Sequence, residues 1–479
     1  MPKTTCVHDH RTIAAMRWVP ISFGIAAVSL LMLPDGLGYD PWSWMIWGHE
    51  LDHGSLVTAG AASAIKPLPV LVDVLLAPFG STAADLWLVC ARAGVLLSIV
   101  VVYHLAKELG GRAAGVTAAV GWFTARQVAG YLALDGMSEP LCAALVLGAV
   151  DAHLCNRRRL AVALGALGAL IRIELWPFVA GYAAMTLWRE NPHSKARAVP
   201  VVALLATVPA AWLVPDALSS GNLLRSAVRA THESQGGPLA TSHPALSTIV
   251  EAGGMLVWPL VAVFVADTAM TTVLWVKRRQ LRATFWLTCA AWAWIGLEAL
   301  MVALRVAAGA PRFLLPGVAL AAVVAGGAWA DLLRRLPSLL PRAKPALVLA
   351  VAWLALSGAS VVGVAKWVRD ERGSWASGAN VQQLADQLPT TVKRLGGRDA
   401  VVGCGTIAAA PLQVPAVAWA LDVPLGDVGI RPSARGVVFA TDGQPTVPAG
   451  YARDYRKVGT VGPPAARWTE LTTCWPDQK

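Results

Sequence analysis

Apolar runs, each close to the roughly 20 residues that a helix needs to cross a lipid bilayer, are the feature that most constrains this chain. Of its 479 residues 56% are hydrophobic and only 14% are charged, too few charges to cover a soluble globule of this size. The runs lie at residues 14–34, 84–106, 112–130, 139–156, 198–215, 249–276, 283–304, 312–333 and 346–364. With one helical hairpin added, they predict an all-α polytopic membrane protein of about 11 helical segments.

The orientation of these segments follows from short clusters of Lys and Arg between the runs, because basic loops face the cytoplasm in membrane proteins. All the clusters are cytoplasmic only if residues 60–82, which prolines interrupt, do not cross and residues 160–188 form a hairpin of two short helices. We therefore expect a multi-pass protein of a bacterial cytoplasmic (inner) membrane with a cytoplasmic N-terminus. Because no basic stripe carries stacking aromatic residues, we expect no nucleic-acid partner.

Charged residues become frequent near the C-terminus, which predicts a transmembrane domain over residues 1–365 and an extracytoplasmic α/β domain over residues 366–479. If that domain is extracytoplasmic, Cys404 and Cys474 form either a disulfide or two buried free thiols, and the sequence leaves both open. The apolar pattern there predicts a helix at 382–394 and strands at 400–404, 436–440 and 455–458.

The first outer loop carries Asp40 directly before Pro41, a strong signal for the start of a helix in which Asp caps and Pro fits the first turn. The Trp-rich helix that follows suits the membrane interface, so Asp40 is expected to be an ionised carboxylate near the outer surface. Without further observations, a plain helix cap with no chemistry explains Asp40 equally well.

The same loop contains the pattern His49-Glu50-x-x-His53, whose spacing puts both histidines on one helix face where zinc could bind with Glu50 as a base. Asp52 places a charge where metalloproteases usually have an apolar residue, and the sequence offers no third ligand. Two interfacial histidines are the simpler interpretation.

Further charged residues are predicted on the outer side of the membrane. Arginine suits the recognition of phosphate at a membrane surface, although ion pairing or snorkelling to headgroups explains any single arginine as well. As a group, these positions indicate an anionic ligand. They are Arg92, Arg126, Asp135, Glu139 in Ser138-Glu139-Pro140, Arg172 and Glu174 at the hairpin apex, and Arg312 at the start of a late helix.

Four local patterns in this order resemble the GT-C superfamily of membrane glycosyltransferases, over about residues 14–364. They are Asp40 in the first outer loop, Ser138-Glu139-Pro140-Leu141, Leu170-Ile171-Arg172-Ile173-Glu174 (like the family's L-x-R-x-E) and Arg312-Phe313-Leu314-Leu315-Pro316. The first loop departs from the paired acidic residues of many members, since its second carboxylate is Glu50, ten residues on.

The resemblance implies a GT-C-like inverting glycosyltransferase that moves a sugar from a polyprenyl-phosphate donor in the lipid bilayer to a glycan, lipid or protein acceptor outside. It implies that Asp40, alone or with Glu50, accepts the acceptor's proton, and that Arg172 and Arg312 stabilise the departing phosphate. The remaining outer charges would contact substrate. No cofactor is certain, and a divalent metal is left open. Residues 60–82 would be a re-entrant or interfacial segment that covers the cleft, and residues 216–248 would form a mobile lid.

Three other classes stay open on the sequence alone. A transporter or flippase of a lipid-linked or anionic substrate would favour helices broken near the midplane and inverted halves. A zinc-dependent membrane protease depends on His49 and His53, and a non-catalytic scaffold would use the C-terminal domain to bind a partner.

Overall fold

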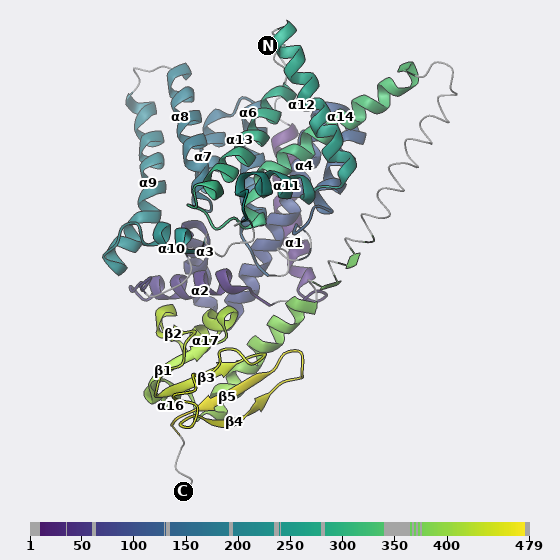
Figure 1. Ribbon diagram of the computed structural model, residues 1–479. Coiled ribbons are helices and arrows are strands. Elements are labelled where there is room, and N and C mark those ends of the chain that lie inside the picture. Colours follow the sequence, from purple (N-terminus) through teal and green to yellow (C-terminus); the bar gives the residue numbers. More distant parts are fainter. Residues whose placement is uncertain are drawn as a thin grey trace.

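The computed structural model describes residues 10–34, 36–59, 64–128, 130, 135–190, 195–233, 239, 241–278, 283–339, 365, 368–369, 372–373 and 376–474. In it, a helical bundle carries a small α/β domain at one end, and one helix lies between the two (Figure 1). The predicted run at 346–364 falls outside the described residues, as does the boundary predicted between residues 365 and 366.

The bundle is built from helices of very different length. Its longer elements are α1 (His10–Ser29), α4 (Ala83–Phe123), α6 (Glu139–Leu154), α7 (Arg158–Ala169), α8 (Trp176–Glu190), α9 (Lys195–Ser220), α11 (Pro244–Met255), α12 (Trp258–Arg278), α13 (Ala283–Ala303) and α14 (Leu315–Leu339). Shorter elements at the end nearest the α/β domain are α2 (Tyr39–Asp52), α3 (Pro67–Leu76), η1 (Ala77–Thr82), η2 (Ile173–Leu175), α10 (Arg225–Glu233) and η3 (Pro311–Leu314).

Five helical stretches within the described residues are long and apolar enough to cross a membrane, which makes this a multi-pass membrane protein. They are Pro67–Phe123, Val199–Ser220, Trp258–Val276, Ala283–Ala303 and Pro311–Arg335. The predicted count of about 11 segments, the sidedness and the lid at 216–248 stay predictions.

The helix α4 is a hairpin of two arms that turns at Gly111, whose φ of 77° lies in the left-handed region that glycine tolerates. The arms run antiparallel, since Trp122 Nε1 donates a hydrogen bond to Ser98 Oγ at 2.8 Å. This turn produces the two predicted segments at 84–106 and 112–130, except that the second arm already ends at Phe123. Helix α14 packs closely against both arms and supplies much of the bundle core.

Two other predictions about the bundle had different outcomes. The hairpin predicted at 160–188 is present as α7 and α8, with η2 at its apex. The single run predicted at 249–276 is wrong, because α11 ends at Met255 and α12 begins at Trp258. Leu256 is extended there (ψ 156°), and Pro259 fits only the first turn of a new helix.

The C-terminal domain contains a five-stranded sheet of order β2-β1-β3-β5-β4, covered by helices. Strand β1 runs parallel to β2 and β3, whereas β5 is antiparallel to β3 and β4, so the predicted α/β class is confirmed. A helix over residues 376–394 precedes the sheet. The elements that follow are α16 (Arg398–Cys404), β1 (Thr406–Ala409), η4 (Pro411–Gln413), α17 (Val414–Leu421), η5 (Leu425–Asp427), β2 (Val428–Gly429), β3 (Gly436–Ala440), β4 (Arg456–Val461) and β5 (Trp468–Thr472).

The strand predicted at 400–404 is wrong, because these residues belong to helix α16 and the strand begins only at Thr406. An apolar run of this length does not by itself distinguish a buried strand from a helix turn. The strands predicted at 436–440 and 455–458 are confirmed as β3 and β4. The predicted helix at 382–394 is also confirmed.

Helix α2 joins the two domains, because its apolar face lies in one core with both of them. Trp44 and Trp47 of α2 are fully buried in a cluster that includes Trp87 of α4 and Val417 of α17. The loop before α2 approaches the α/β domain so closely that a Cβ at Gly36 would lie 2.7 Å from a backbone nitrogen of the 376–394 helix. Helix α2 therefore lies between the bundle and the α/β domain, in contact with both (Figure 1).

Cys404 and Cys474 form a disulfide, which excludes the alternative of two free thiols. The bond closes a loop with a sequence separation of 70, and a loop of that size contributes about 4 kcal/mol by restricting the unfolded chain. We expect the double variant Cys404→Ser/Cys474→Ser, or the reductant-treated protein, to lose the domain's fold at lower temperature in a tryptophan-fluorescence melt. Cys289→Ser, at an exposed free cysteine, is the control. Equal melting of all variants would contradict this expectation.

Candidate functional site

Asp40 lies in the first turn of α2 and points its carboxylate at Arg312 of η3. The predicted role as N-cap is wrong, because the helix begins at Tyr39 and Gly38 is the N-cap, with no side-chain hydrogen bond to the helix end. Arg312 Nη2 instead donates to Asp40 Oδ2 at 3.1 Å. The Asp40 side chain is thereby held by a cation from a distant part of the chain, and it does not cap its own helix.

Glu139 is the centre of the site. It opens α6 as predicted, is 1% exposed, and its Oε1 lies near three cations. Lys66 Nζ donates to it at 2.8 Å, Arg312 Nε lies 3.4 Å away and Arg172 Nη1 lies 3.8 Å away. A buried carboxylate is costly unless it is paired, and here three positive charges compensate it.

Arg172 at the apex of the α7–α8 hairpin is locked on all sides. Its guanidinium makes a two-point ion pair with Glu174, of which the Nε to Oε2 contact is 3.0 Å, and lies 3.7 Å from Glu298 of α13. The ring of Phe313 covers its face at 3.5 Å from the guanidinium carbon, a cation–π contact. Trp294 of α13 fixes the backbone of Phe313 through a hydrogen bond of 2.9 Å.

These groups form one connected ion network at the meeting point of α2, α3, α6, η2, α13 and η3. Its charged members are Lys66, Arg172 and Arg312, with Asp40, Glu139, Glu174 and Glu298. Among the described residues, the network is most exposed at one edge: the Asp40 and Arg312 side chains are 22% and 24% exposed, whereas those of Arg172 and Glu139 are 7% and 1% exposed. A ligand from outside therefore meets the Asp40–Arg312 pair first.

Asp135 lies beside this open edge. Its carbonyl oxygen accepts a hydrogen bond of 2.9 Å from Gly38 N, just before α2 begins. Burial raises the pKa of the Asp135 carboxyl to about 7, while the charge of Arg312 acts in the opposite direction. The loop before α6 thus brings a further carboxyl group to the edge where Asp40 and Arg312 meet.

Two predicted site arginines lie outside the network and hold local structure. Arg92 donates to Ser29 Oγ at 2.9 Å and to the carbonyl of Pro34, which fastens the end of α1. Arg126 is ion-paired with Glu251, and its backbone N–H donates to Met255 O. Both are predicted substrate contacts that the structure does not bring to the site.

The predicted partnership of Glu50 with Asp40 is likewise not seen, because the two lie ten residues apart at opposite ends of α2, about 15 Å along its axis. Glu50 Oε2 accepts a hydrogen bond of 2.7 Å from Val57 N. Burial raises the pKa of the Glu50 carboxyl to about 6, opposed by that hydrogen bond and supported by the charge of Asp427.

His49 and His53 lie on one face of α2 with ring centroids 4.3 Å apart and ring planes tilted by 53°, as the i, i+4 spacing predicts. Across the described ranges of the chain, no three His, Cys, Asp or Glu side chains are placed to hold a metal ion. The described residues therefore offer no third zinc ligand beside His49 and His53, which the zinc-protease hypothesis requires.

Sequence reasoning does not include two charged members of the network, Lys66 and Glu298, or the adjoining Phe313 among the candidate site residues. Lys66 and Glu298 are charged residues inside apolar stretches, and such residues are usually functional or paired, so their placement was the available signal. Phe313 carried no signal, because its role as a cover for Arg172 depends on the approach of η3 to the hairpin apex.

Comparison with known proteins shows likeness in fold and not in sequence. No family model matches the chain, and no curated protein matches it. The crystal structure of ArnT from Cupriavidus metallidurans bound to undecaprenyl phosphate matches with a TM-score of 0.52 at 13% identity, over 97% of this chain and 100% of that one. The apo state of ArnT matches with a TM-score of 0.53 at 13% identity, over 96% and 98%.

The oligosaccharyltransferase of Archaeoglobus fulgidus, solved in complex with zinc and sulfate, gives a TM-score of 0.48 at 14% identity, over 88% of this chain and 62% of that one. The likeness to ArnT, a GT-C membrane glycosyltransferase, extends over nearly the whole chain. It shows that this chain has a GT-C-like fold, as the resemblance of its motifs predicts.

Proposed function

We propose that this protein is an inverting membrane glycosyltransferase that moves a sugar from a polyprenyl-phosphate donor to an extracytoplasmic acceptor. The observation that carries the proposal is the ion network, which gathers Lys66, Arg172 and Arg312 around Glu139 with Asp40 at its open edge. The GT-C-like fold supports it, and the ArnT structure that shares this fold contains undecaprenyl phosphate.

The phosphate of the donor would enter by exchanging partners with the open ion pair. Arg312 is the most exposed cation of the network, and its contact with Asp40 is a single hydrogen bond of 3.1 Å. A phosphate oxygen accepts stronger, charge-assisted hydrogen bonds from a guanidinium group. When Arg312 turns to the phosphate, Asp40 Oδ2 is released from that hydrogen bond and can accept another one from the acceptor hydroxyl.

Asp40 would then accept the proton of the acceptor hydroxyl as that oxygen attacks the anomeric carbon. The bond from the anomeric carbon to the phosphate oxygen breaks, and the polyprenyl phosphate leaves with its electron pair. Arg312, with Lys66 and Arg172 behind it, offsets the charge that develops on the leaving phosphate. Glu139 holds the three cations in place, since it lies within 3.8 Å of all of them.

Binding of undecaprenyl phosphate to purified protein in nanodiscs tests the proposal. We expect Arg312→Gln to weaken binding by roughly one to two orders of magnitude, because a charge-assisted hydrogen bond is lost. Arg126→Gln is the matched control: this arginine is also paired with a carboxylate, but it lies outside the network. The proposal would be wrong if the wild type did not bind undecaprenyl phosphate, or if both variants lost the same amount of affinity for it.

A further inference from the structure

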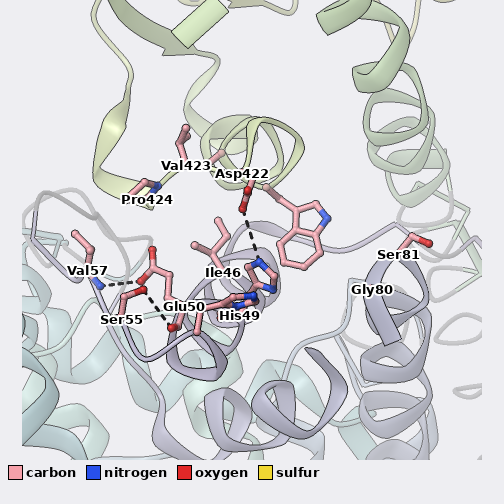
Figure 2. A pocket seen from close by; sticks show the side chains of 13 residues that line it. Ile46, His49, Glu50, Ser55, Val57, Gly80, Ser81, Asp422, Val423 and Pro424 are labelled. Atoms are coloured by element: carbon pink, nitrogen blue, oxygen red, sulfur yellow. Dashed lines mark hydrogen bonds and ion pairs between the residues drawn. The ribbon is translucent and has the colours of Figure 1, made fainter. Parts of the chain in front are cut away.

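A cavity lies between the C-terminal half of α2 and helix α17 of the α/β domain (Figure 2), and no member of the ion network lines it. Its volume of about 570 Å³ is within the range of about 300–1,000 Å³ that is usual for small-molecule sites. Both domains line this α2–α17 pocket. Its polar and aromatic groups are His49, Glu50, His53, Ser55, Ser81, Trp419 and Asp422.

Trp419 gives the pocket an aromatic wall. The indole is partly exposed, and its position is fixed by two neighbours on α2: the Trp42 ring at 5.8 Å and the His49 ring at 5.7 Å, edge-on. An indole held in this way is a rigid apolar surface with one polar edge. The apolar C–H face of a sugar ring packs well against such a surface.

Hydrogen-bond acceptors, from the carboxylates, and imidazole groups that can donate or accept surround that wall. Asp422 enters from the α/β domain, with its Oδ1 3.7 Å from His49 Nε2 (Figure 2). On the opposite side, Val57 N fixes one oxygen of Glu50, and Glu50 Oε1 has no hydrogen-bond partner within the described residues. Carboxylates and imidazoles in such an arrangement match the mixed donors and acceptors of neighbouring sugar hydroxyls.

The charge of the pocket selects against anions. None of its lining residues in the described part of the chain is Lys or Arg. Two carboxylates face it, and Asp427 adds a third negative charge that acts on Glu50. A phosphate or uronic acid would meet repulsion here, in contrast to the cationic network around Glu139.

We propose that the α2–α17 pocket binds a neutral sugar ring of the acceptor, which makes the acceptor a glycan. This inference rests on the proposed function, because it names the acceptor class of that reaction. The α2 residue of the pocket nearest to Asp40 is Ile46, six residues and about 9 Å along the helix from it, and the polar lining begins at His49, about 14 Å away. A glycan that fills the pocket and reaches Asp40 therefore contains more than one sugar ring.

The test is binding of full-length protein in nanodiscs, without donor lipid, to an array of neutral, amino-bearing and uronic-acid oligosaccharides. We expect binding to neutral oligosaccharides, weakened roughly tenfold by Trp419→Ala because the aromatic wall is lost. Asp422→Asn is a second variant that keeps the fold: its side chain is 71% exposed, and Asn tolerates its left-handed φ of 49°. It should weaken binding as well, whereas Asp399→Asn, at a 97% exposed aspartate on α16, should not.

The inference is overturned if no glycan binds, if only amino-bearing or uronic-acid glycans bind, or if both pocket variants bind like the wild type. Undecaprenyl phosphate binding, measured on the same preparations, separates this failure from that of the proposed function. Lipid binding without glycan binding would remove the acceptor assignment alone. Glycan binding without lipid binding would leave the pocket assigned and remove the donor.

Discussion

Asp40→Asn lowers the rate of sugar transfer by about 10²- to 10⁴-fold, the contribution typical of a general base. Asn keeps the size of the side chain and still accepts the hydrogen bond from Arg312 Nη2 that holds Asp40 in the network. Only the capacity to take a proton is lost, so undecaprenyl phosphate should bind at least as tightly as to the wild type. The measurement pairs the transfer rate from a polyprenyl-phosphate sugar with the dissociation constant of undecaprenyl phosphate.

Asp52→Asn is the matched control for that experiment, because Asp52 lies at the other end of the same helix and outside the network. We expect it to leave the transfer rate unchanged. Full activity of Asp40→Asn would remove Asp40 from the mechanism. A parallel loss of lipid binding would assign Asp40 to donor binding instead of proton transfer.

Arg172→Ala is the change with the largest expected effect on stability. It leaves Glu174 and Glu298 buried without their cation, and breaking a buried pair in this way costs about 3–5 kcal/mol. It also removes the guanidinium beneath Phe313, which lies next to Arg312 in η3. We expect a clear drop of the melting temperature and loss of transfer together.

The double variant Arg172→Ala/Glu298→Gln separates the charge effect from the loss of packing. Removing one of the stranded carboxylates should restore part of the melting temperature, because fewer buried charges are left unpaired. Transfer should not return, since the cation behind Arg312 is still missing. An Arg172→Ala protein that melts like the wild type would show that the network does not contribute to stability.

The sequence predicts which residues belong to the site better than it predicts which of them pair with one another. Asp40, Glu139, Arg172, Glu174 and Arg312 were identified because each opens a helix or marks a hairpin apex on the predicted outer side. Their pairing could not be read from spacing. Arg312 is 272 residues from Asp40, and such contacts are set by how the helices pack.

Two predictions from the sequence are wrong. One takes closeness in sequence as a sign of contact, and the other takes a short apolar run as a sign of a strand. Glu50 is predicted to act with Asp40 because both lie in the predicted first outer loop. The two residues instead lie at opposite ends of α2, and the length of that helix keeps their side chains apart. The run at 400–404 predicts a strand because it is short and apolar. Helix α16 instead packs in the apolar core of the α/β domain, with Val401 fully buried.

The most direct test of the central claim is a structure of the protein in nanodiscs with undecaprenyl phosphate bound. We predict that the phosphate lies within hydrogen-bond distance of Arg312, that the contact between Arg312 and Asp40 is broken, and that Arg172 stays paired with Glu174. A phosphate bound elsewhere, with the Asp40–Arg312 pair intact, would contradict the assignment of the ion network as the donor site.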